Sequence, residues 1–582
     1  MNLAQKLTAG LEKKYRVFTV LSPIVMLGEV LMETTIPLVM AKIVDVGIAR
    51  EDAGYVVRLG LLMVLMSVFS LCCGAGCGRL SSLAAFGFSK NLRRNLFRKV
   101  QAFSFSTMDS FGTGSLVTRL TTDVTNIQNL YQNLIRSAVR SPLMLIFGTI
   151  MACFINIKLA CIFFVVIPLL ALFLTVIATK SYPRFKHMLE RYDVLNNTVQ
   201  ENLVAIRVVK SFVRGDFECE KFDSVADLLR KAQVRAEKIV ILNQPIMKLL
   251  VYSCIVCALW FGGNMILSGD MTTGELISFL SYINQTLMSL MMLSMMFIQF
   301  MMSRASVSRI SEILDAQTES ADSVAQISSS SAQPKELSGE IQFNDVYFSY
   351  TNDANNCVLS GINLHIHPGA TVGIIGGTGS SKTTLVSLVP RLYDVLKGSV
   401  FVDGKDVRAY DLKELRQKIG VVLQKNTLFS GTIAENLRWG NEGASDEELK
   451  NACIASDADS FISNFPDKYE TVLEQGGVNL SGGQKQRLCI ARALVKKPEI
   501  LILDDSTSAV DTATDMRIRT ALRKNFSRTT KLIIAQRINS VQDADFIVVL
   551  DDGKINGIGT HEELLASNKI YQEVYESQMS EN

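Results

Sequence analysis

The segment Thr371-Val-Gly-Ile-Ile-Gly-Gly-Thr-Gly-Ser-Ser-Lys-Thr-Thr384 decides the fold of the C-terminal half of this 582-residue chain. Its apolar start, through Ile375, is typical of a buried strand, and the glycine-rich turn that follows leads into a helix. Such a turn lets successive backbone N–H groups surround phosphate groups at a helix N-terminus. Lys382 is placed to neutralise the β- and γ-phosphates of a nucleotide, and Thr383 to hold Mg²⁺. The expected phosphate-binding residues are Gly376, Gly377, Thr378, Gly379, Ser380, Ser381, Lys382, Thr383 and Thr384.

Short β-rich runs alternate with helical patterns around this segment. The runs are Ala370–Ile375, Lys418–Leu423, Ile500–Leu503 and Lys531–Ile534. This alternation predicts an α/β domain over residues 339–582. The third run is followed directly by Asp504, the position expected for a carboxylate that reaches Mg²⁺. The preceding residues 317–338 are rich in Ser, Gln, Glu and Asp, which predicts a linker.

The N-terminal half contains six apolar stretches, several of them longer than the ~20 residues that cross a bilayer's hydrocarbon core. They are Val17–Ala41, Val56–Cys73, Pro142–Phe154, Leu159–Ala178, Met247–Leu267 and Leu276–Met302. The third is short and needs residues 137–141 to reach spanning length. The first is too long for a signal peptide, and no small-residue cleavage site follows it. The sequence therefore predicts an N-terminal segment over residues 1–16 and a six-helix transmembrane domain over residues 17–316.

The distribution of Lys and Arg predicts the orientation of these helices. Between the third and fourth stretches only Lys158 is basic, and between the fifth and sixth no residue is. The basic residues flanking the first stretch and those between the second and third are Lys6, Lys13, Lys14, Arg16, Lys90, Arg93, Arg94, Arg98, Lys99, Arg119, Arg136 and Arg140. The positive-inside bias therefore places both chain ends in the cytoplasm. The two long inward loops have helical patterns, so the membrane helices are expected to extend into the cytosol.

Composition narrows the class of protein. Hydrophobic residues make up 48% of the chain, which is high for a wholly soluble protein. The net charge of +3 gives no indication of a nucleic-acid partner. The eleven cysteines are scattered or lie in apolar stretches, so no disulfide framework is predicted. Cys254 and Cys257 form a C-x-x-C on an apolar helix, where small packing residues are the usual interpretation.

A third motif, Leu480-Ser-Gly-Gly-Gln484, lies between the phosphate loop and Asp504. With these three motifs the sequence resembles the ATP-binding cassette (ABC) exporters whose membrane and nucleotide-binding domains are fused in one chain. Tyr350 matches the aromatic residue that stacks on adenine, and Gln424 matches the glutamine near Mg²⁺ and the reacting phosphate. Residues 508–511 match the segment that follows the metal-binding strand. The resemblance covers essentially the whole chain.

The resemblance implies an ATP-hydrolysing transporter that works as a head-to-tail dimer of nucleotide-binding domains, with ATP and Mg²⁺ as cofactors. Each ATP would lie between the Lys382 loop of one subunit and the signature of the other. The signature residues expected to contact nucleotide are Ser481, Gly482, Gly483 and Gln484. Segments near Asp109–Val117 and Ser211–Asp216 resemble the coupling helices that transmit motion to the membrane; the alternative is that they are solvated turns.

Three residues of one ATP site depart from the family pattern. Asp505 stands where hydrolysing members carry Glu, and its side chain is about 1.5 Å shorter. A displacement of ~1 Å can slow a catalysed step ~100-fold. Gln536 stands where the family has His, and an amide cannot carry positive charge. Ser381 replaces the last glycine of the phosphate loop, where backbone must approach phosphate closely.

These departures lead to the main functional hypothesis. The site built on Lys382, Asp504 and Asp505 is expected to bind ATP and hydrolyse it slowly. The intact signature would complete the competent site of a homologous partner. The chain therefore resembles the degenerate-site subunit of bacterial heterodimeric multidrug exporters in the plasma membrane. A homodimeric lipid or peptide exporter and a channel-like regulatory subunit gated by ATP are the alternatives.

The first and sixth apolar stretches carry the candidate cargo residues. Glu29 and Glu33 lie one helical turn apart within the first stretch, where charge is costly and usually functional. They are read either as a cation- or proton-binding spot or as a structural pair hydrogen-bonded to neighbouring helices near Thr34 and Thr35. The methionines of the sixth stretch, including the candidates Met292 and Met296, suit varied apolar shapes but also ordinary packing. Small amphipathic or drug-like molecules are the expected cargo.

Overall fold

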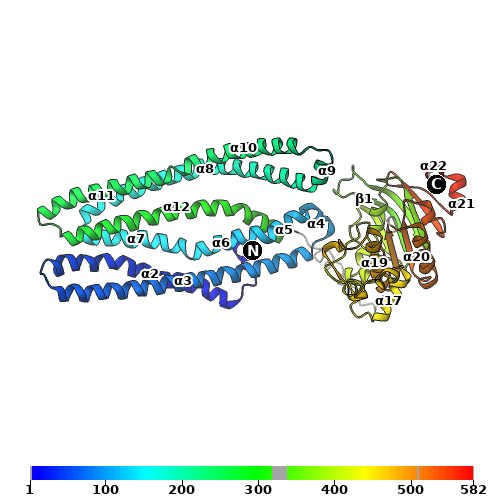
Figure 1. The fold of residues 1–582 in the computed structure, drawn as a ribbon, viewed down its shortest axis with the longest axis horizontal. Coiled ribbons are helices and arrows are strands. Elements are labelled where there is room, and N and C mark those ends of the chain that lie inside the picture. The colour runs from blue at the N-terminus through cyan, green and yellow to red at the C-terminus, as the bar shows by residue number, and fades with distance from the viewer. Residues whose placement is uncertain (1–2, 317–336, 507–509, 581–582) are drawn as a thin grey trace. The chain divides into compact units, whose positions relative to one another are not determined.

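The computed structural model describes residues 3–316, 337–506 and 510–580, and the chain divides into two compact units. Unit 1 comprises Met1–Gln101 and Thr113–Ala316, and unit 2 comprises Ala102–Gly112 and Gln317–Asn582 (Figure 1). The nucleotide-binding unit therefore includes a short segment from the N-terminal half. Most of the expected linker, and residues 508 and 509 of the segment after Asp504, lie outside the described residues.

Unit 1 is entirely helical where it is described. Its helices are α1 (Leu3–Leu7), α2 (Lys13–Lys42), the π-helical η1 (Ile43–Ile48), α3 (Ala53–Gln101), α5 (Thr113–Thr118), the π-helical η2 (Arg119–Asp123), α6 (Val124–Ile135), α7 (Ser137–Ile155), α8 (Ile157–Val204), α9 (Ile206–Ser211), α10 (Gly215–Val240), α11 (Asn243–Leu267) and α12 (Thr273–Asp315). Among the described residues, six helical stretches are long and apolar enough to cross a membrane, as predicted. The third apolar run lies in α7, which starts at Ser137, within a helical stretch that extends from Thr113 to Ile155.

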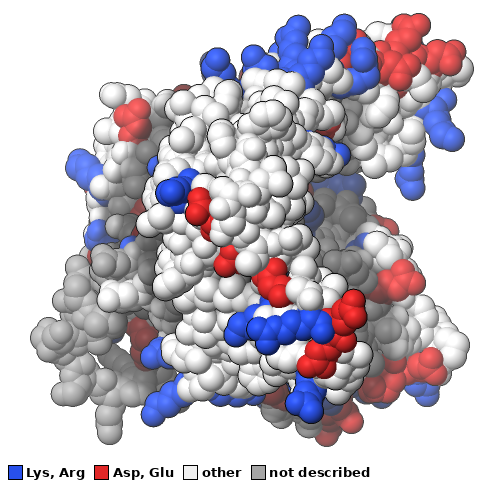
Figure 2. Space-filling model, turned by 90° about the vertical axis from the view of Figure 1, so that its left-hand side faces the viewer, with Lys and Arg blue, Asp and Glu red and all other residues white. Residues whose placement is uncertain are grey.

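These stretches are longer than a membrane requires. At 1.5 Å per residue, α12 with its 43 residues extends about 65 Å, roughly twice the hydrocarbon thickness. Large apolar side chains such as Leu65, Phe164 and Trp260 are exposed along the helices, as expected where lipid replaces water. The end of unit 1 that faces the viewer in Figure 2 is also largely uncharged. Arg50, Glu51 and Asp52 in the α2–α3 connection are exposed.

One carboxylate joins two of these helices at the α11–α12 turn. Asp45 in η1 accepts a hydrogen bond from the Thr272 hydroxyl at 2.6 Å and another from the backbone N–H of Gly274 at 2.7 Å. A side chain at Gly274 would place its Cβ only 2.4 Å from the carbonyl oxygen of Ala41, so the helices approach too closely for any other residue. The start of α12 is thereby fixed against the end of the first span.

Unit 2 contains three sheets. The strands are β1 (Ile341–Phe348), β2 (Leu359–Ile366), β3 (Thr371–Gly376), β4 (Lys397–Val402), β5 (Lys405–Asp406), β6 (Ile419–Val422), β7 (Gly431–Thr432), β8 (Val472–Leu473), β9 (Ile500–Asp504), β10 (Thr530–Ile534), β11 (Phe546–Asp551) and β12 (Lys554–Gly559). The largest sheet has the order β12-β11-β3-β10-β9-β6, with all neighbours parallel except β12 and β11. An antiparallel sheet, β2-β1-β4-β5, and the pair β7-β8 complete the unit.

The described part of unit 2 also contains helices, of which Figure 1 labels α4, α17, α19, α20, α21 and α22. They are α4 (Phe105–Phe111), α14 (Lys382–Ser387), α15 (Leu412–Lys418), α16 (Ile433–Arg438), α17 (Asp446–Ala455), α18 (Asp459–Ile462), α19 (Gly482–Val495), α20 (Thr512–Asn525), α21 (His561–Ser567) and α22 (Lys569–Ser580). Alternate residues of β9 enter different cores: Ile500 and Ile502 pack on the side of the antiparallel sheet, and Leu501 and Leu503 on the side of α19. Burial on both faces explains why this strand is a continuous apolar run.

Candidate functional site: a nucleotide site at the sheet edge

The predicted nucleotide residues gather at one edge of the six-stranded sheet. Strands β3, β10, β9 and β6 are neighbours and run parallel, so their carboxyl ends meet there. Ile534 of β10 lies between Ile374 of β3 and Asp504 of β9. The phosphate loop follows β3, Asp505 follows β9, Gln536 follows β10 and Gln424 follows β6. The topology thus brings together residues that are up to 160 positions apart in the sequence.

The phosphate loop has the tight geometry expected of its glycines at two positions. A Cβ at Gly376 would lie 2.1 Å from the carbonyl oxygen of Leu550, and Gly379 has a φ of 87°. Ser381 caps α14 with a φ of 71°, a left-handed conformation that glycine adopts at no steric cost and other residues at about 1–2 kcal/mol. Ser381, which replaces glycine at this position, therefore has a strained backbone.

Lys382 and Thr383 reach opposite sides of the loop. The Lys382 ammonium donates hydrogen bonds to the carbonyl oxygens of Gly376 and Gly377, both at 2.8 Å. Burial lowers the pKa of Lys382, and the nearby carboxylates of Asp504 and Asp505 oppose that effect. The Thr383 hydroxyl lies 2.9 and 3.0 Å from the two oxygens of Asp504.

The pairing of Thr383 with Asp504 fits a magnesium site. Burial, with Asp504 only 3% exposed, raises the pKa of this carboxyl; the charge of Asp505 raises it further, and the hydrogen bond from Thr383 opposes the rise. Mg²⁺ keeps several waters and takes phosphate oxygens, so one hydroxyl and one carboxylate are sufficient protein ligands. Among the described residues, no group of three or more His, Cys, Asp or Glu side chains could hold a metal ion.

Two of the three departures from the family pattern are in direct contact. The Gln536 amide donates a hydrogen bond to a carboxylate oxygen of Asp505 at 2.9 Å. The Asp505 backbone N–H donates a hydrogen bond to the carbonyl oxygen of Ile534 at 3.1 Å. The carbonyl oxygen of Asp505 accepts a hydrogen bond from the Gln486 side-chain amide at 3.1 Å. Asp505 adopts a φ of 48°, so backbone and side chain are both constrained. This contact could not be read from the sequence, because it depends on the pairing of β9 with β10.

The signature segment begins a helix. Ser481 caps α19: its hydroxyl accepts from the backbone N–H of Gln484 at 3.3 Å, and the Gln484 side chain accepts from the Ser481 N–H at 2.9 Å. Leu480 is buried and anchors the turn, whereas Ser481 and Gly482 are exposed. An exposed helix N-terminus of this kind presents backbone N–H groups to an anion such as phosphate. Within unit 2 this is a second surface able to bind phosphate.

The remaining nucleotide candidates flank the phosphate loop. The Tyr350 hydroxyl lies 2.9 Å from the Thr384 hydroxyl, and half of the tyrosine side chain is exposed. Gln424 is exposed just beyond the end of β6. Asp511, the last residue of the segment that follows Asp505, caps α20 by accepting from the Thr514 backbone N–H at 2.9 Å. Tyr350 therefore lies beside the phosphate loop, and Gln424 follows the carboxyl end of β6.

Helix α4 packs beside Tyr350, a contact that sequence reasoning missed. Tyr393 donates a hydrogen bond to the Asp109 carboxylate at 2.7 Å, and its ring lies 6.1 Å from that of Phe105 and 5.2 Å from that of Tyr350. Burial, and secondarily the bond to Asp109, raises the pKa of Tyr393. The helix runs from Phe105 to Phe111 and is followed by Gly112, so the expected coupling segment Asp109–Val117 comprises the end of α4 and part of α5. No sequence signal singled out Tyr393.

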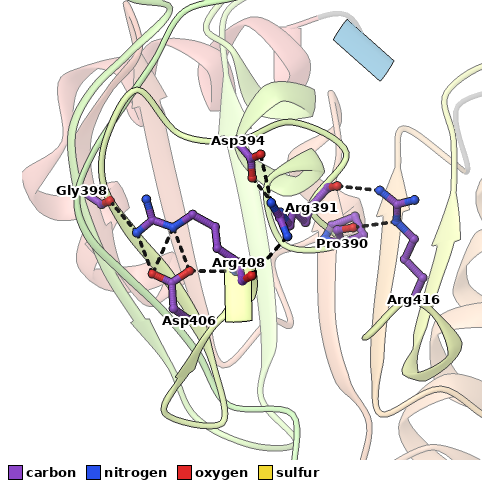
Figure 3. Close-up of polar contacts among 7 residues, drawn as sticks. All are labelled: Pro390, Arg391, Asp394, Gly398, Asp406, Arg408 and Arg416. Carbon is purple, nitrogen blue, oxygen red and sulfur yellow. Dashed lines mark hydrogen bonds and ion pairs between the residues drawn. The ribbon is translucent and has the colours of Figure 1, made fainter. Parts of the chain in front are cut away.

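An arginine network supports the loop that carries Tyr393 (Figure 3). The Arg391 guanidinium is 9% exposed and donates to both oxygens of Asp394, at 2.7 and 3.2 Å, and to the carbonyl oxygen of Arg408. Arg408 in turn pairs with Asp406, and Arg416 donates to the carbonyl oxygens of Pro390 and Arg391. Because Arg391 itself has a φ of 49°, these contacts hold the loop in a conformation that it would otherwise avoid.

The second expected coupling segment, Ser211–Asp216, lies in unit 1 where α9 ends and α10 begins. Phe212 is 74% exposed and Val213 is 87% exposed, and Val213 adopts a φ of 53°. The segment is therefore an ordered turn with exposed apolar side chains.

The candidate cargo residues of unit 1 are the acidic pair Glu29 and Glu33 on α2 and the methionines Met292 and Met296 on α12. Glu33 receives two hydrogen bonds from Arg140 of α7, at 2.8 and 2.9 Å, and Glu29 lies 3.4 Å from the same guanidinium. Arg140, counted above with the basic residues outside the spans, therefore lies inside one. The Thr34 and Thr35 hydroxyls bond to carbonyl oxygens of their own helix instead. Met292 lines a cavity beside these charges, and Met296 is not among the residues that line it.

Comparison with known proteins identifies the family. Residues 19–291 match the model for the ABC transporter transmembrane region, and residues 359–508 match the model for the ABC transporter. The uncharacterized ABC transporter ATP-binding protein YfiB of Bacillus subtilis is 38% identical over 566 residues, which cover 97% of each chain. An ATP-dependent lipid A-core flippase of Desulfotalea psychrophila is 33% identical over 489 residues, 84% of each chain.

A solved structure agrees with this relationship. The structure of a bacterial Atm1-family ABC exporter with ATP bound matches with a TM-score of 0.82 and 25% identity, covering 96% of this chain and 98% of the other. The similarity spans both the helical unit and the nucleotide-binding unit. The chain therefore belongs to the ABC transporters: it is an ATP-driven exporter half-transporter, with one transmembrane domain fused to one ATP-binding domain, and exporters of this family act as dimers.

Proposed function

We propose that this chain is one subunit of a heterodimeric exporter and that its own ATP site hydrolyses slowly. The observation that carries the proposal is the 2.9 Å hydrogen bond between Gln536 and Asp505. The amide that would reach toward the γ-phosphate donates instead to the carboxylate that would polarise the attacking water. A carboxylate that accepts this bond is a weaker base, and it is also one methylene short.

The intact signature supports a partner with a competent site. Ser481, Gly482, Gly483 and Gln484 begin α19 with their capping contacts in place. In a head-to-tail dimer these residues complete the site of the other subunit, whereas Tyr350, the loop from Gly376 to Thr384, Gln424 and Asp504 form this chain's own site. Thr383 and Asp504, with Gln424 nearby, would hold Mg²⁺, which would neutralise phosphate charge. A homodimer would contain two slow sites, so a homologous second subunit is the better explanation.

The membrane unit supports a proposal for the cargo and the location. We propose that the complex exports small amphipathic or drug-like molecules across the plasma membrane of a bacterium. The methionine-rich sixth span and the cavity beside Met292 support a cargo with an apolar part. The excess of Lys and Arg beside the first span and between the second and third supports cytoplasmic chain ends.

The test is the ATPase activity of the purified chain alone and of the same chain co-purified with its partner from native membranes. Low activity alone and at least about 100-fold higher activity in a complex with a second half-transporter are expected, given the sensitivity of catalysis to ~1 Å displacements. Comparable activity in the chain alone, with no second subunit recovered, would replace the heterodimer with a homodimer.

A homodimeric lipid exporter is the second candidate, because a lipid A-core flippase is among the relatives. It predicts full ATPase activity from this chain alone in nanodiscs, stimulated by lipid. A regulatory role, with ATP as a gating ligand, predicts ATP binding without transport even when the partner is present. Transport into inside-out vesicles by the purified complex separates that role from export.

A further inference from the structure

The backbone that carries Gln536 extends past the end of strand β10. The last residue of β10 that pairs in register with β3 and β9 is Ile534. Beyond it, Arg537 is extended, with a φ of −98° and a ψ of 128°, and a 3₁₀ turn covers Ile538–Ser540. The position of Gln536 is therefore not set by the strand register that fixes the rest of β10.

A side chain from the C-terminal helix α22 holds this backbone in place. The Gln578 side-chain amide donates a hydrogen bond to the carbonyl oxygen of Gln536 at 2.7 Å. The oxygen of the same amide accepts a hydrogen bond from the backbone N–H of Ile538 at 2.9 Å. A glutamine side chain has both a donor and an acceptor, so one residue can satisfy two backbone groups. Gln578 thus takes the part that a neighbouring strand plays in a sheet.

Helix α22 is itself fixed to the core of unit 2. Tyr571, near its start, is fully buried, and the tyrosine hydroxyl lies 2.7 Å from Nδ1 of His561 in α21. Tyr575, one turn further along, packs against the hydrophobic core that also contains Ile538. Because the helix is anchored at its start and in its middle, the Gln578 side chain reaches the segment after β10 from a fixed base.

The segment that Gln578 holds also makes the contact inside the ATP site. The side-chain amide of Gln536 donates to the Asp505 carboxylate at 2.9 Å. A hydrogen bond is lost when its donor and acceptor are more than roughly 3.5 Å apart, so a backbone shift of about 1 Å at Gln536 is enough to break this one. The contact with Asp505 therefore depends on a residue that lies 42 positions later in the chain than Gln536.

We propose that Gln578 is a positioning residue of the ATP site: it holds the Gln536 amide against Asp505. Gln578 acts through the backbone of Gln536 and not on the nucleotide itself. The C-terminal helix α22 is then part of the ATP site as well as part of the fold. The sign of its effect rests on the proposed function, in which the contact between Gln536 and Asp505 slows hydrolysis.

The first test needs no nucleotide. Amide hydrogen exchange over residues 533–542 is measured in the full chain in nanodiscs, unaltered and with Gln578→Met. Methionine has a similar length and makes neither hydrogen bond. Exchange in this segment should become about 5-fold faster, because a single hydrogen bond contributes on this scale. Unchanged exchange would overturn the proposal, since the segment would then be held without Gln578.

The second test measures the ATPase activity of the chain purified alone, in two backgrounds. In the unaltered background, Gln578→Met should raise kcat about 5-fold and leave KM for ATP unchanged, because Asp505 is released while the phosphate loop keeps its contacts. In a Gln536→Ala background the same substitution should have no effect, because no amide remains to be positioned. Equal effects in the two backgrounds, or no effect in either, would overturn the proposal.

The matched control is Gln572→Met. Gln572 is a half-buried glutamine of the same helix, and its amide donates to the carbonyl oxygen of Leu565, away from the segment after β10. This variant should leave both the exchange and kcat unchanged. If it matched Gln578→Met in either measurement, the effect would belong to the stability of α22 and the proposal would fail.

The two backgrounds also separate this inference from the proposed function. A fall in kcat with Gln578→Met that disappears in the Gln536→Ala background would support Gln578 as a positioning residue. The same fall would contradict the proposed slow site, because the contact between Gln536 and Asp505 would then assist hydrolysis.

Discussion

The edge of the six-stranded sheet and the start of α19 are both built to bind phosphate, yet only one departs from its family. At the sheet edge, Ser381 is strained, Asp505 is short and Gln536 is bonded to Asp505. At α19, Ser481 and Gln484 keep the reciprocal capping contacts. In the proposed head-to-tail heterodimer these surfaces would belong to different ATP sites. Under that proposal the slow site is built on this chain's sheet edge, and the competent site uses its signature.

The largest effect is expected at α19. Ser481→Ala removes the hydroxyl that, in our proposal, contacts the partner's nucleotide, and the loss of one such donor to developing charge slows catalysis about 100-fold or more. ATPase activity of the purified complex is the measurement. Unaltered turnover would show that the signature does not serve the active site, and the comparison of the two surfaces would fail.

Ser445→Ala is the matched control for this variant. Ser445 caps α17 with the same reciprocal contacts, to Glu448, so each variant loses about 1 kcal/mol of helix capping. Only Ser481→Ala should affect turnover. If both variants lower turnover equally, the effect is one of stability.

The second prediction concerns a double variant that restores the family residues at the sheet edge. Asp505→Glu combined with Gln536→His restores reach and removes the amide that engages the carboxylate. ATPase activity of the chain purified alone should rise between about 10- and 100-fold, the range associated with repositioning a catalytic group by ~1 Å. A rise no greater than that of either single variant would assign the remaining defect to Ser381.

A smaller gain is expected from Asp505→Glu alone. The longer carboxylate regains reach, but Gln536 still donates to it, so the rise in activity of the isolated chain should stay below about 10-fold. Asp467→Glu, at an exposed aspartate that precedes the 3₁₀ turn at Lys468–Glu470, is the control. A jump to the activity of the double variant would mean that Gln536 has little effect.

The smallest expected effect concerns the packing of α4 rather than chemistry. Tyr393→Phe keeps the ring contacts and removes the hydrogen bond to Asp109, worth about 1 kcal/mol. Amide hydrogen exchange over residues 105–111 should become about 5-fold faster. Tyr347→Phe is the control, because the Tyr347 hydroxyl makes no hydrogen bond within the described residues. Equal exchange in both variants would show that the rings alone hold α4.

Sequence patterns predicted features that depend on local order. The apolar run Ile500–Leu503 became β9, the glycine-rich turn became the loop before α14, and six apolar stretches became six membrane-spanning helices. The continuous run of aliphatic residues in β9 indicates that the strand is buried on both faces. Motif spacing likewise located Lys382, Thr383 and Asp504 at one sheet edge.

Contacts between distant segments could not be predicted in this way. Arg140 was counted between the second and third apolar stretches because the third was taken to start at Pro142, but it lies in α7 and pairs with Glu33 on another helix. Gln536 contacts Asp505 only because β9 and β10 are paired in register. Tyr393 lies 284 residues from Asp109, with no periodic pattern to connect them. Each case depends on tertiary pairing that one sequence does not display.

The position of α4 in the chain has a consequence for synthesis. At about 5–20 residues per second, a ribosome needs roughly 15–60 s to travel the 284 residues from Asp109 to Tyr393. During that interval the α4 segment has left the ribosome, and the loop that will hold it has not been made. The nucleotide-binding unit therefore includes a segment that is translated well before the rest of it.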